Sequence, residues 1–127
     1  MKITVTLSLP DRRLSPNYTV GSFRGRMGKA NAIKKYRQAA HAAGIIASHG
    51  ERLKWKEATV EATFYFKQDR RRDGDNLQGS LKAAFDGLAD AGVVSNDSGF
   101  RHQPVKQAKD KANPRVEITI TRKDGAE

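Results

Sequence analysis

The amino-acid sequence predicts a single domain of mixed α/β (α+β) structure, in which two helices pack on a small mixed sheet. Three observations predict it. The chain has 127 residues, which is enough for one hydrophobic core but not for two. Segments with strand-like alternation and segments with helix-like periodicity follow one another in the order β-α-β-α-β-β. Neither an internal repeat nor a change in composition divides the chain, so we expect residues 1–127 to form one unit.

The first half of the chain contains a strand, a long loop and a helix. Apolar side chains alternate with Lys, Thr and Ser over residues 2–9, which predicts a strand with one buried face. Residues 10–28 are rich in Gly, Pro, Ser, Asn and Arg and predict a flexible basic loop; a loop of that length in a small domain is often functional. Residues 29–49 predict a helix with an apolar stripe made of Ile33, Tyr36, Ala40, Ala43 and Ala47.

The second half contains a strand, a helix and two further strands. Residues 58–67 alternate between apolar and polar side chains and predict the second strand. After a polar run, apolar residues at helical spacing predict a helix over residues 76–91. A short strand is expected over residues 101–108, where Pro104 indicates an edge position because proline has no backbone N–H to donate. Residues 116–121 alternate again and predict the last strand.

Positive charge dominates the composition. Lys and Arg number 24 against 14 Asp and Glu, which gives a net charge of +10 and a pI of about 10.2. This balance favours a polyanionic partner, usually a nucleic acid, and the alternative is a merely soluble basic surface. Within the predicted loop and first helix, the candidate phosphate contacts are Arg24, Arg26, Lys34 and Lys35. The alternative for these four side chains is a solvated surface with no partner.

Composition also excludes several classes of protein. The chain contains no cysteine, so disulfides, zinc-thiolate sites and a cysteine nucleophile are excluded. Its N-terminal segment alternates polar and apolar side chains, unlike a signal peptide, and no window has the length of a transmembrane helix. We therefore expect a cytoplasmic protein without a membrane partner, and we assign it no small-molecule cofactor.

Two carboxylates one residue apart are the first candidates for chemistry. Asp73 and Asp75 follow Arg70, Arg71 and Arg72 at the predicted junction of strand and helix, and these arginines are candidate phosphate contacts. Side chains two residues apart in an extended chain point the same way, so the carboxylates can converge. A divalent cation relieves their repulsion, and Mg²⁺ prefers such oxygen ligands and suits phosphodiester hydrolysis. The structural alternative is that Asp75 caps the helix and Asp73 is a turn residue paired with an arginine.

Lys82 and Asp97 extend this candidate site. A continuous helix would place Lys82 on the same face as Asp75, where its ammonium can orient a phosphate. The alternative for Lys82 is an ion pair with Asp86, four residues further on. Asp97 is a third acid, and its surroundings are also typical of a plain turn.

The predicted second helix limits where Asp97 can act. A helix of sixteen residues is about 24 Å long, and the loop after it reaches at most about 20 Å. Asp97 therefore cannot easily return to its own Asp75 unless the helix is shorter or bent. We expect Asp97 to join the Asp73 and Asp75 pair of a second subunit, which predicts a homodimer; a loose site within one chain is the alternative.

The residues of this segment also carry a resemblance. Asp73-Gly74-Asp75-Asn76-Leu77, the run from Lys82 to Leu88, Ala91-Gly92 and Asn96-Asp97-Ser98 together resemble the RusA family of Holliday-junction resolvases, typical of phages and prophages. The resemblance spans nearly the whole chain and is specific over the catalytic segment, residues 70–98.

The resemblance implies a homodimeric endodeoxyribonuclease that resolves four-way DNA junctions by paired symmetric nicks in recombination and repair. It implies Mg²⁺ as cofactor, with Mn²⁺ as a substitute, held by Asp73, Asp75 and Asp97, and an essential lysine that corresponds to Lys82. In better-known members that lysine follows the second aspartate by four residues, whereas here the spacing is seven, as if Gly79-Ser80-Leu81 were inserted. Two alternatives stay open: a non-catalytic nucleic-acid-binding module, and a general branched-DNA nuclease.

Overall fold

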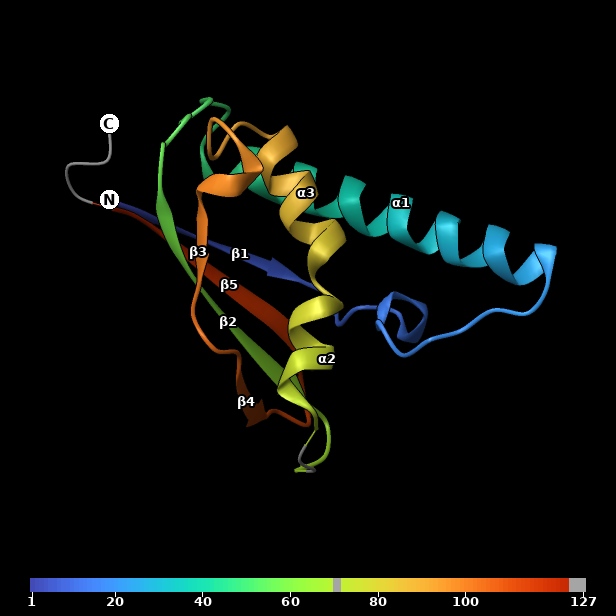
Figure 1. The fold of residues 1–127 in the computed structure, drawn as a ribbon. Helices are drawn as coiled ribbons and strands as arrows, with labels where there is room; N and C mark the ends of the chain where they lie inside the picture. The colour runs from blue at the N-terminus through green and yellow to red at the C-terminus, as the bar shows by residue number, and fades with distance from the viewer. Residues whose placement is uncertain (70–71, 124–127) are drawn as a thin grey trace.

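A five-stranded mixed sheet forms the centre of the structure, a computed structural model that describes residues 1–69 and 72–123 (Figure 1). Three long strands lie in the order β1 (Lys2–Leu7), β5 (Arg115–Arg122) and β2 (Ala58–Phe66), and β5 is antiparallel to both neighbours. Two short strands, β3 (Phe100–His102) and β4 (Lys106–Lys109), run parallel to β2 along its other edge. The expected α+β domain with a small mixed sheet is confirmed.

Helices cover one face of this sheet (Figure 1). α1 (Phe23–Ala47) connects β1 to β2, and α2 (Gly74–Gly79) and α3 (Lys82–Asp90) connect β2 to β3. Short 3-10 turns form η1 (Arg12–Leu14) and η2 (Asp97–Gly99). Throughout residues 1–69 and 72–123, no helix is long and apolar enough to cross a membrane.

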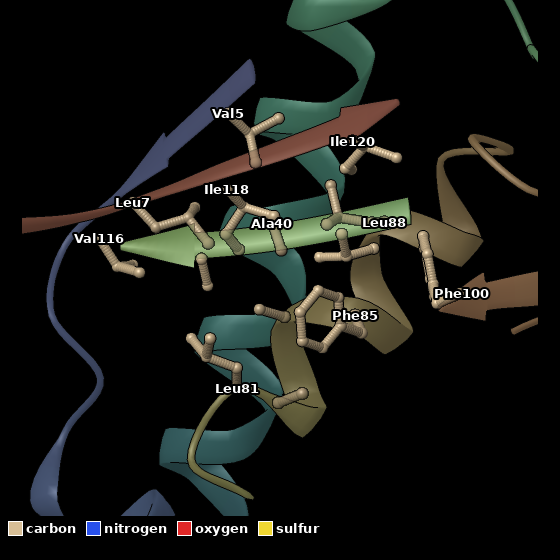
Figure 2. Close-up of a cluster of buried hydrophobic side chains, with 14 of the residues drawn as sticks. Val5, Leu7, Ala40, Leu81, Phe85, Leu88, Phe100, Val116, Ile118 and Ile120 are labelled. Atoms are coloured by element: carbon tan, nitrogen blue, oxygen red, sulfur yellow. The ribbon is translucent and has the colours of Figure 1, made fainter. Parts of the chain in front are cut away.

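The core lies between the sheet and the helices α1 and α3 (Figure 2). Alternate residues of the long strands point into it, because successive side chains of a strand face opposite sides. Ile118 and Ile120 of β5 are fully buried there, in one cluster with Ala40 of α1 and Leu88 of α3. The two predicted alternating strands in the middle and at the end of the chain are confirmed.

α1 and α3 approach each other closely at a glycine. A Cβ atom on Gly87 of α3 would lie 2.1 Å from the carbonyl oxygen of Arg37 on α1, so this contact requires glycine. At the edge of the same contact, Arg37 donates hydrogen bonds of 2.7 and 2.9 Å to the two carboxylate oxygens of Asp90. This ion pair connects the exposed margins of the two helices.

The buried stripe of α1 differs in part from the predicted one. Its buried residues follow a four-residue spacing: Ala32, Tyr36, Ala40 and Gly44. Ala43 and Ala47 are partly buried and pack against the core, as predicted. Ile33 is 39% exposed, so its prediction was wrong. Small residues of this stripe face α3, because a Cβ on Gly44 would lie 3.1 Å from the Leu88 side chain and one on Gly87 would lie 2.9 Å from the Ala40 Cβ, and they allow the two helices to lie close.

α1 also begins earlier than predicted. Its first residue is Phe23, and the Ser22 hydroxyl caps it by accepting a 3.0 Å hydrogen bond from the Gly25 N–H. The predicted flexible loop over residues 10–28 is therefore wrong in its last part, and Arg24 and Arg26 lie on a helix. None of residues 23–31 is buried, so this first part of α1 extends beyond the core.

Two other predicted elements are divided. The helix predicted over residues 76–91 is interrupted between α2 and α3, where the Ser80 hydroxyl donates a 2.6 Å hydrogen bond to the Leu77 carbonyl. The strand predicted over residues 101–108 is divided into β3 and β4, and Pro104 lies between them. Both halves lie at the outer edge of β2, so the predicted edge position is confirmed.

Candidate active site

Asp73 and Asp75 lie at the start of α2. The Asp73 side chain caps the helix by accepting a 2.9 Å hydrogen bond from the backbone N–H of Asp75. Asp75 lies in the first turn and is exposed. The structural alternative correctly predicted a helix cap, but it assigned this role to Asp75, whereas the capping residue is Asp73. A capping carboxylate uses one oxygen and leaves its second oxygen for another partner.

Asp97 lies in a turn that is held firmly against the domain. It begins η2, where the Asn96 side chain accepts a 3.1 Å hydrogen bond from the Ser98 N–H. Gly99 completes the turn, and a Cβ at this position would lie 2.4 Å from the carbonyl oxygen of Lys56. The expected turn role of Asp97 is confirmed, while its carboxylate remains exposed.

Two adjoining hollows bring these acids near each other. Asp97 and Lys82 line the first hollow, and Asp75 lines the second. Gln78 and His102 line both hollows, so they lie between Asp75 and Asp97. One chain therefore places Asp97 and Lys82 in a hollow with Gln78 and His102, and it places Asp75 in the adjoining hollow with the same two side chains.

Sequence reasoning missed both shared residues. Gln78 follows Asp75 by three residues, a spacing that puts two side chains on neighbouring positions of one helix face, so this signal was present. His102 carried no such signal, because its place depends on the parallel pairing of β3 with β2. Its ring packs against Phe85 with 4.4 Å between ring centroids. Burial lowers the pKa of His102 and so favours its neutral form.

Lys82 reaches this site by a different route from the predicted one. A continuous helix would put Lys82 on the same face as Asp75, but the helix is interrupted before α3. Lys82 instead begins α3 and lines the hollow of Asp97. Its ammonium lies 3.2 Å from a carboxylate oxygen of Asp86, so the alternative ion pair is confirmed, although 82% of the Lys82 side chain is exposed.

The interruption also changes the argument about Asp97. The expected need for a second subunit rested on a straight helix that carries the chain too far from Asp75. With α2 and α3 separate, the hollows of Asp75 and Asp97 adjoin within one chain. However, in the part of the chain that the structure describes, no three acidic or histidine side chains are close enough to share a metal ion. The carboxylate oxygens suit Mg²⁺ chemically, but one chain does not gather them into one cluster.

Positive charge is concentrated in one part of the molecule. Residues 12–50 contain eight Lys and Arg side chains and neither Asp nor Glu, whereas the rest of the chain contains sixteen Lys and Arg and all fourteen acids. Most of this stretch is α1. The candidate phosphate contacts on α1 are all exposed: Arg24, Arg26, Lys34 and Lys35. A uniform cationic helix of this kind is suited to a phosphate backbone.

Arg72 is the member of the three-arginine run that the structure describes, while Arg70 and Arg71 lie outside the described residues. The Arg72 guanidinium lies over the Phe66 ring, 3.7 Å from the ring centroid. Its backbone exchanges two hydrogen bonds with the Gln107 side chain of β4, at 3.2 and 2.9 Å. Arg72 is thus fixed beside Asp73 by contacts on both its backbone and its side chain.

Cleavage of a nucleic acid requires cationic side chains that hold the backbone and carboxylates that can hold a metal ion at the reacting phosphate. A protein that only binds nucleic acid gains no affinity from exposed acids beside its basic surface, because they repel phosphate. A domain that combines both is suited to nuclease chemistry. The family is specified by a comparison with protein-family models, in which the endodeoxyribonuclease RusA matches residues 14–121. The chain belongs to the RusA endodeoxyribonuclease family, and membership implies junction-resolving nuclease activity on branched DNA. A search of curated proteins returns no match.

Proposed function

We propose that this protein is a Mg²⁺-dependent crossover junction endodeoxyribonuclease, which acts as a homodimer and resolves four-way DNA by paired symmetric nicks in recombination and repair. One observation carries the proposal: in a chain of the RusA family, Asp75 lines a hollow that adjoins the hollow of Asp97 and Lys82. We expect Mn²⁺ to substitute for Mg²⁺, because both accept oxygen ligands in similar geometry.

The proposed roles follow from the positions of the side chains. Asp73, Asp75 and Asp97 would hold the ion, which when bound supplies a more acidic water and offsets charge on the phosphate. Lys82 would orient the phosphate to be cleaved, exchanging its exposed pair with Asp86 for a charge-assisted contact.

The cationic residues of α1 would hold the DNA backbone away from the cleaved bond. A four-way junction is close to two-fold symmetric, so a two-fold dimer would present identical sites to opposite strands. The lysine spacing of seven residues places Lys82 at the start of α3 rather than on α2.

The cleavage test compares a synthetic four-way junction with a matched linear duplex, in Mg²⁺ and in EDTA. We expect paired nicks in the junction alone, lost in EDTA and in Asp75→Asn. Glu51→Gln is the matched control, because it removes one exposed carboxylate outside both hollows. Junction binding without cleavage in either Mg²⁺ or Mn²⁺ would show a non-catalytic binding module. Equal cutting of flaps and three-way junctions would show a general branched-DNA nuclease.

A mixing experiment then asks which subunit supplies Asp97. Asp75→Asn and Asp97→Asn proteins are each expected to be inactive, and their subunits are allowed to exchange. If Asp97 serves the partner's site, a mixed dimer contains one intact site and recovers nicking. If Asp97 serves its own chain, both sites in the mixed dimer are damaged and no nicking returns.

A further inference from the structure

A third hollow opens on the opposite side of α2 from the Asp75 hollow. It has a volume of about 710 Å³ and lies between the η1 loop, the end of β2 and α2. Phe66 and Leu77 form a half-buried apolar floor. Arg12, Asn76 and Asp73 lie at its polar margin, so the hollow begins at one of the proposed metal ligands. A concave apolar floor with a few polar groups is the usual form of a small-ligand site.

A flat guanidinium forms one wall of this hollow. The Arg72 guanidinium lies 3.7 Å from the centroid of the Phe66 ring, and the Gln107 side chain holds the Arg72 backbone through two hydrogen bonds. Planar guanidinium groups are stacking surfaces for nucleobases, and a guanidinium already packed on a ring loses little freedom when a base is added.

The charge at the margin argues against a simple phosphate site. Arg12 and Arg72 are accompanied by the carboxylates of Asp11 and Asp73. The hydrogen bond from Arg13 lowers the pKa of Asp11 to about 2, so this carboxylate is charged at neutral pH. Two carboxylates repel a phosphate, whereas they can accept hydrogen bonds from the amino groups of a base.

We propose that this hollow binds an unstacked nucleobase next to the phosphate that is cleaved, with the base stacked on Arg72 and its edge facing Asn76 and Arg12. The proposal rests on the proposed function, because a phosphate held by a metal ion at Asp73 would bring its neighbouring base to this hollow. Unstacking a base costs least where its pairing is already disturbed, so we expect the bound base to lie at the branch point. Arg72 would therefore help to select where the DNA is cut, in addition to its expected contact with the DNA backbone.

The test is a binding experiment with the full-length protein and a four-way junction that carries 2-aminopurine at successive positions near the branch point. Ca²⁺ replaces Mg²⁺ so that binding is measured without cleavage. We expect fluorescence to rise severalfold at one position, because the probe loses its stacked neighbours. Arg72→Lys keeps the charge but removes the planar surface, and it should at least halve this rise. Arg52→Lys is the matched control, because it removes one exposed guanidinium outside α1 and outside all three hollows, and it should keep the full rise.

A second variant tests the same hollow independently, in case Arg72→Lys does not fold. Leu9→Trp fills the hollow without a change of charge, and it should also abolish the rise while the junction still binds. In Mg²⁺, wild type should cut some junctions faster than others that differ only in the bases beside the cut. Arg72→Lys should reduce this ratio of cleavage rates by about tenfold, as expected for loss of one stacked base.

The proposal is overturned if no probe position brightens, or if Arg72→Lys and Arg52→Lys behave alike. These outcomes are distinct from failure of the proposed function, which is absence of cutting in Mg²⁺ and Mn²⁺. The fluorescence measurement is made in Ca²⁺, so it tests base binding whether or not the protein cuts DNA in Mg²⁺ or Mn²⁺.

Discussion

Gly99→Ala adds one methyl group where the turn of Asp97 meets the backbone before β2. The new Cβ would lie 2.4 Å from the Lys56 carbonyl oxygen, and real Cβ atoms essentially never approach closer than 3.0 Å, so the two must separate by at least about 0.6 Å. No side-chain rotation relieves the contact, because the opposing atom belongs to the backbone. Overpacking of this kind costs about 1–3 kcal/mol of stability. A displacement of about 1 Å in a catalytic group can lower a rate by about 100-fold.

We therefore expect Gly99→Ala to lower the free energy of unfolding by about 1–3 kcal/mol in urea titrations. Junction cleavage should slow by about 10- to 100-fold, because Asp97 moves with the turn. Junction affinity should stay within about twofold, since the cationic helix α1 is not part of this turn. Gly21→Ala is the matched control, because nothing lies within 4 Å of a Cβ at that position. The reasoning is refuted if Gly99→Ala is as stable and as active as Gly21→Ala.

Two further predictions concern the packing of α1. Gly87→Ala should lower the free energy of unfolding by about 1–2 kcal/mol, because overpacking against the Arg37 carbonyl exceeds the gain of about 1 kcal/mol in helix propensity. The measurement is a urea titration, and an unchanged free energy of unfolding would contradict the close contact. Burial raises the pKa of Tyr36, whose hydroxyl donates a 2.8 Å hydrogen bond to the Ser8 carbonyl. Its stabilisation is complete below pH about 10 and is lost as the pH rises further, because the unfolded phenol ionises first. Unfolding titrations from pH 8 to 11 should show wild type lose its advantage over Tyr36→Phe above pH 10, and a constant difference would contradict this.

The long strands and the core were predictable because their periodicity is local. Residues 58–67 and 116–121 alternate strictly, and one buried face is the simplest way to satisfy that pattern. Boundaries were less predictable. The glycines around Phe23 favoured a loop, whereas the Ser22 cap starts the helix there. At the end of α2, just before the interruption, a Cβ on Gly79 would lie 2.3 Å from the Pro16 ring, and such a close contact is invisible in the sequence.

Some residues of the candidate site could also be predicted from local sequence features, and others could not. Asp73 and Asp75 were found because their spacing and their place after a strand are local features. The position of Asp97 beside Lys82 could not be inferred, because it depends on the broken helix and on the docking of η2. His102 enters the site only through the pairing of β3 with β2, so a single sequence provides no pattern that points to it.

The order of the strands has a consequence for how the protein folds as it is synthesised. β1 and β2 do not pair with each other, and β5 lies between them, with Lys2 opposite Thr121. The sheet therefore cannot close until almost the last residue of β5 has left the ribosome. Until then, β1 and β2 both expose unpaired edges, and the contacts that complete the sheet span nearly the whole chain, which makes folding slow and late.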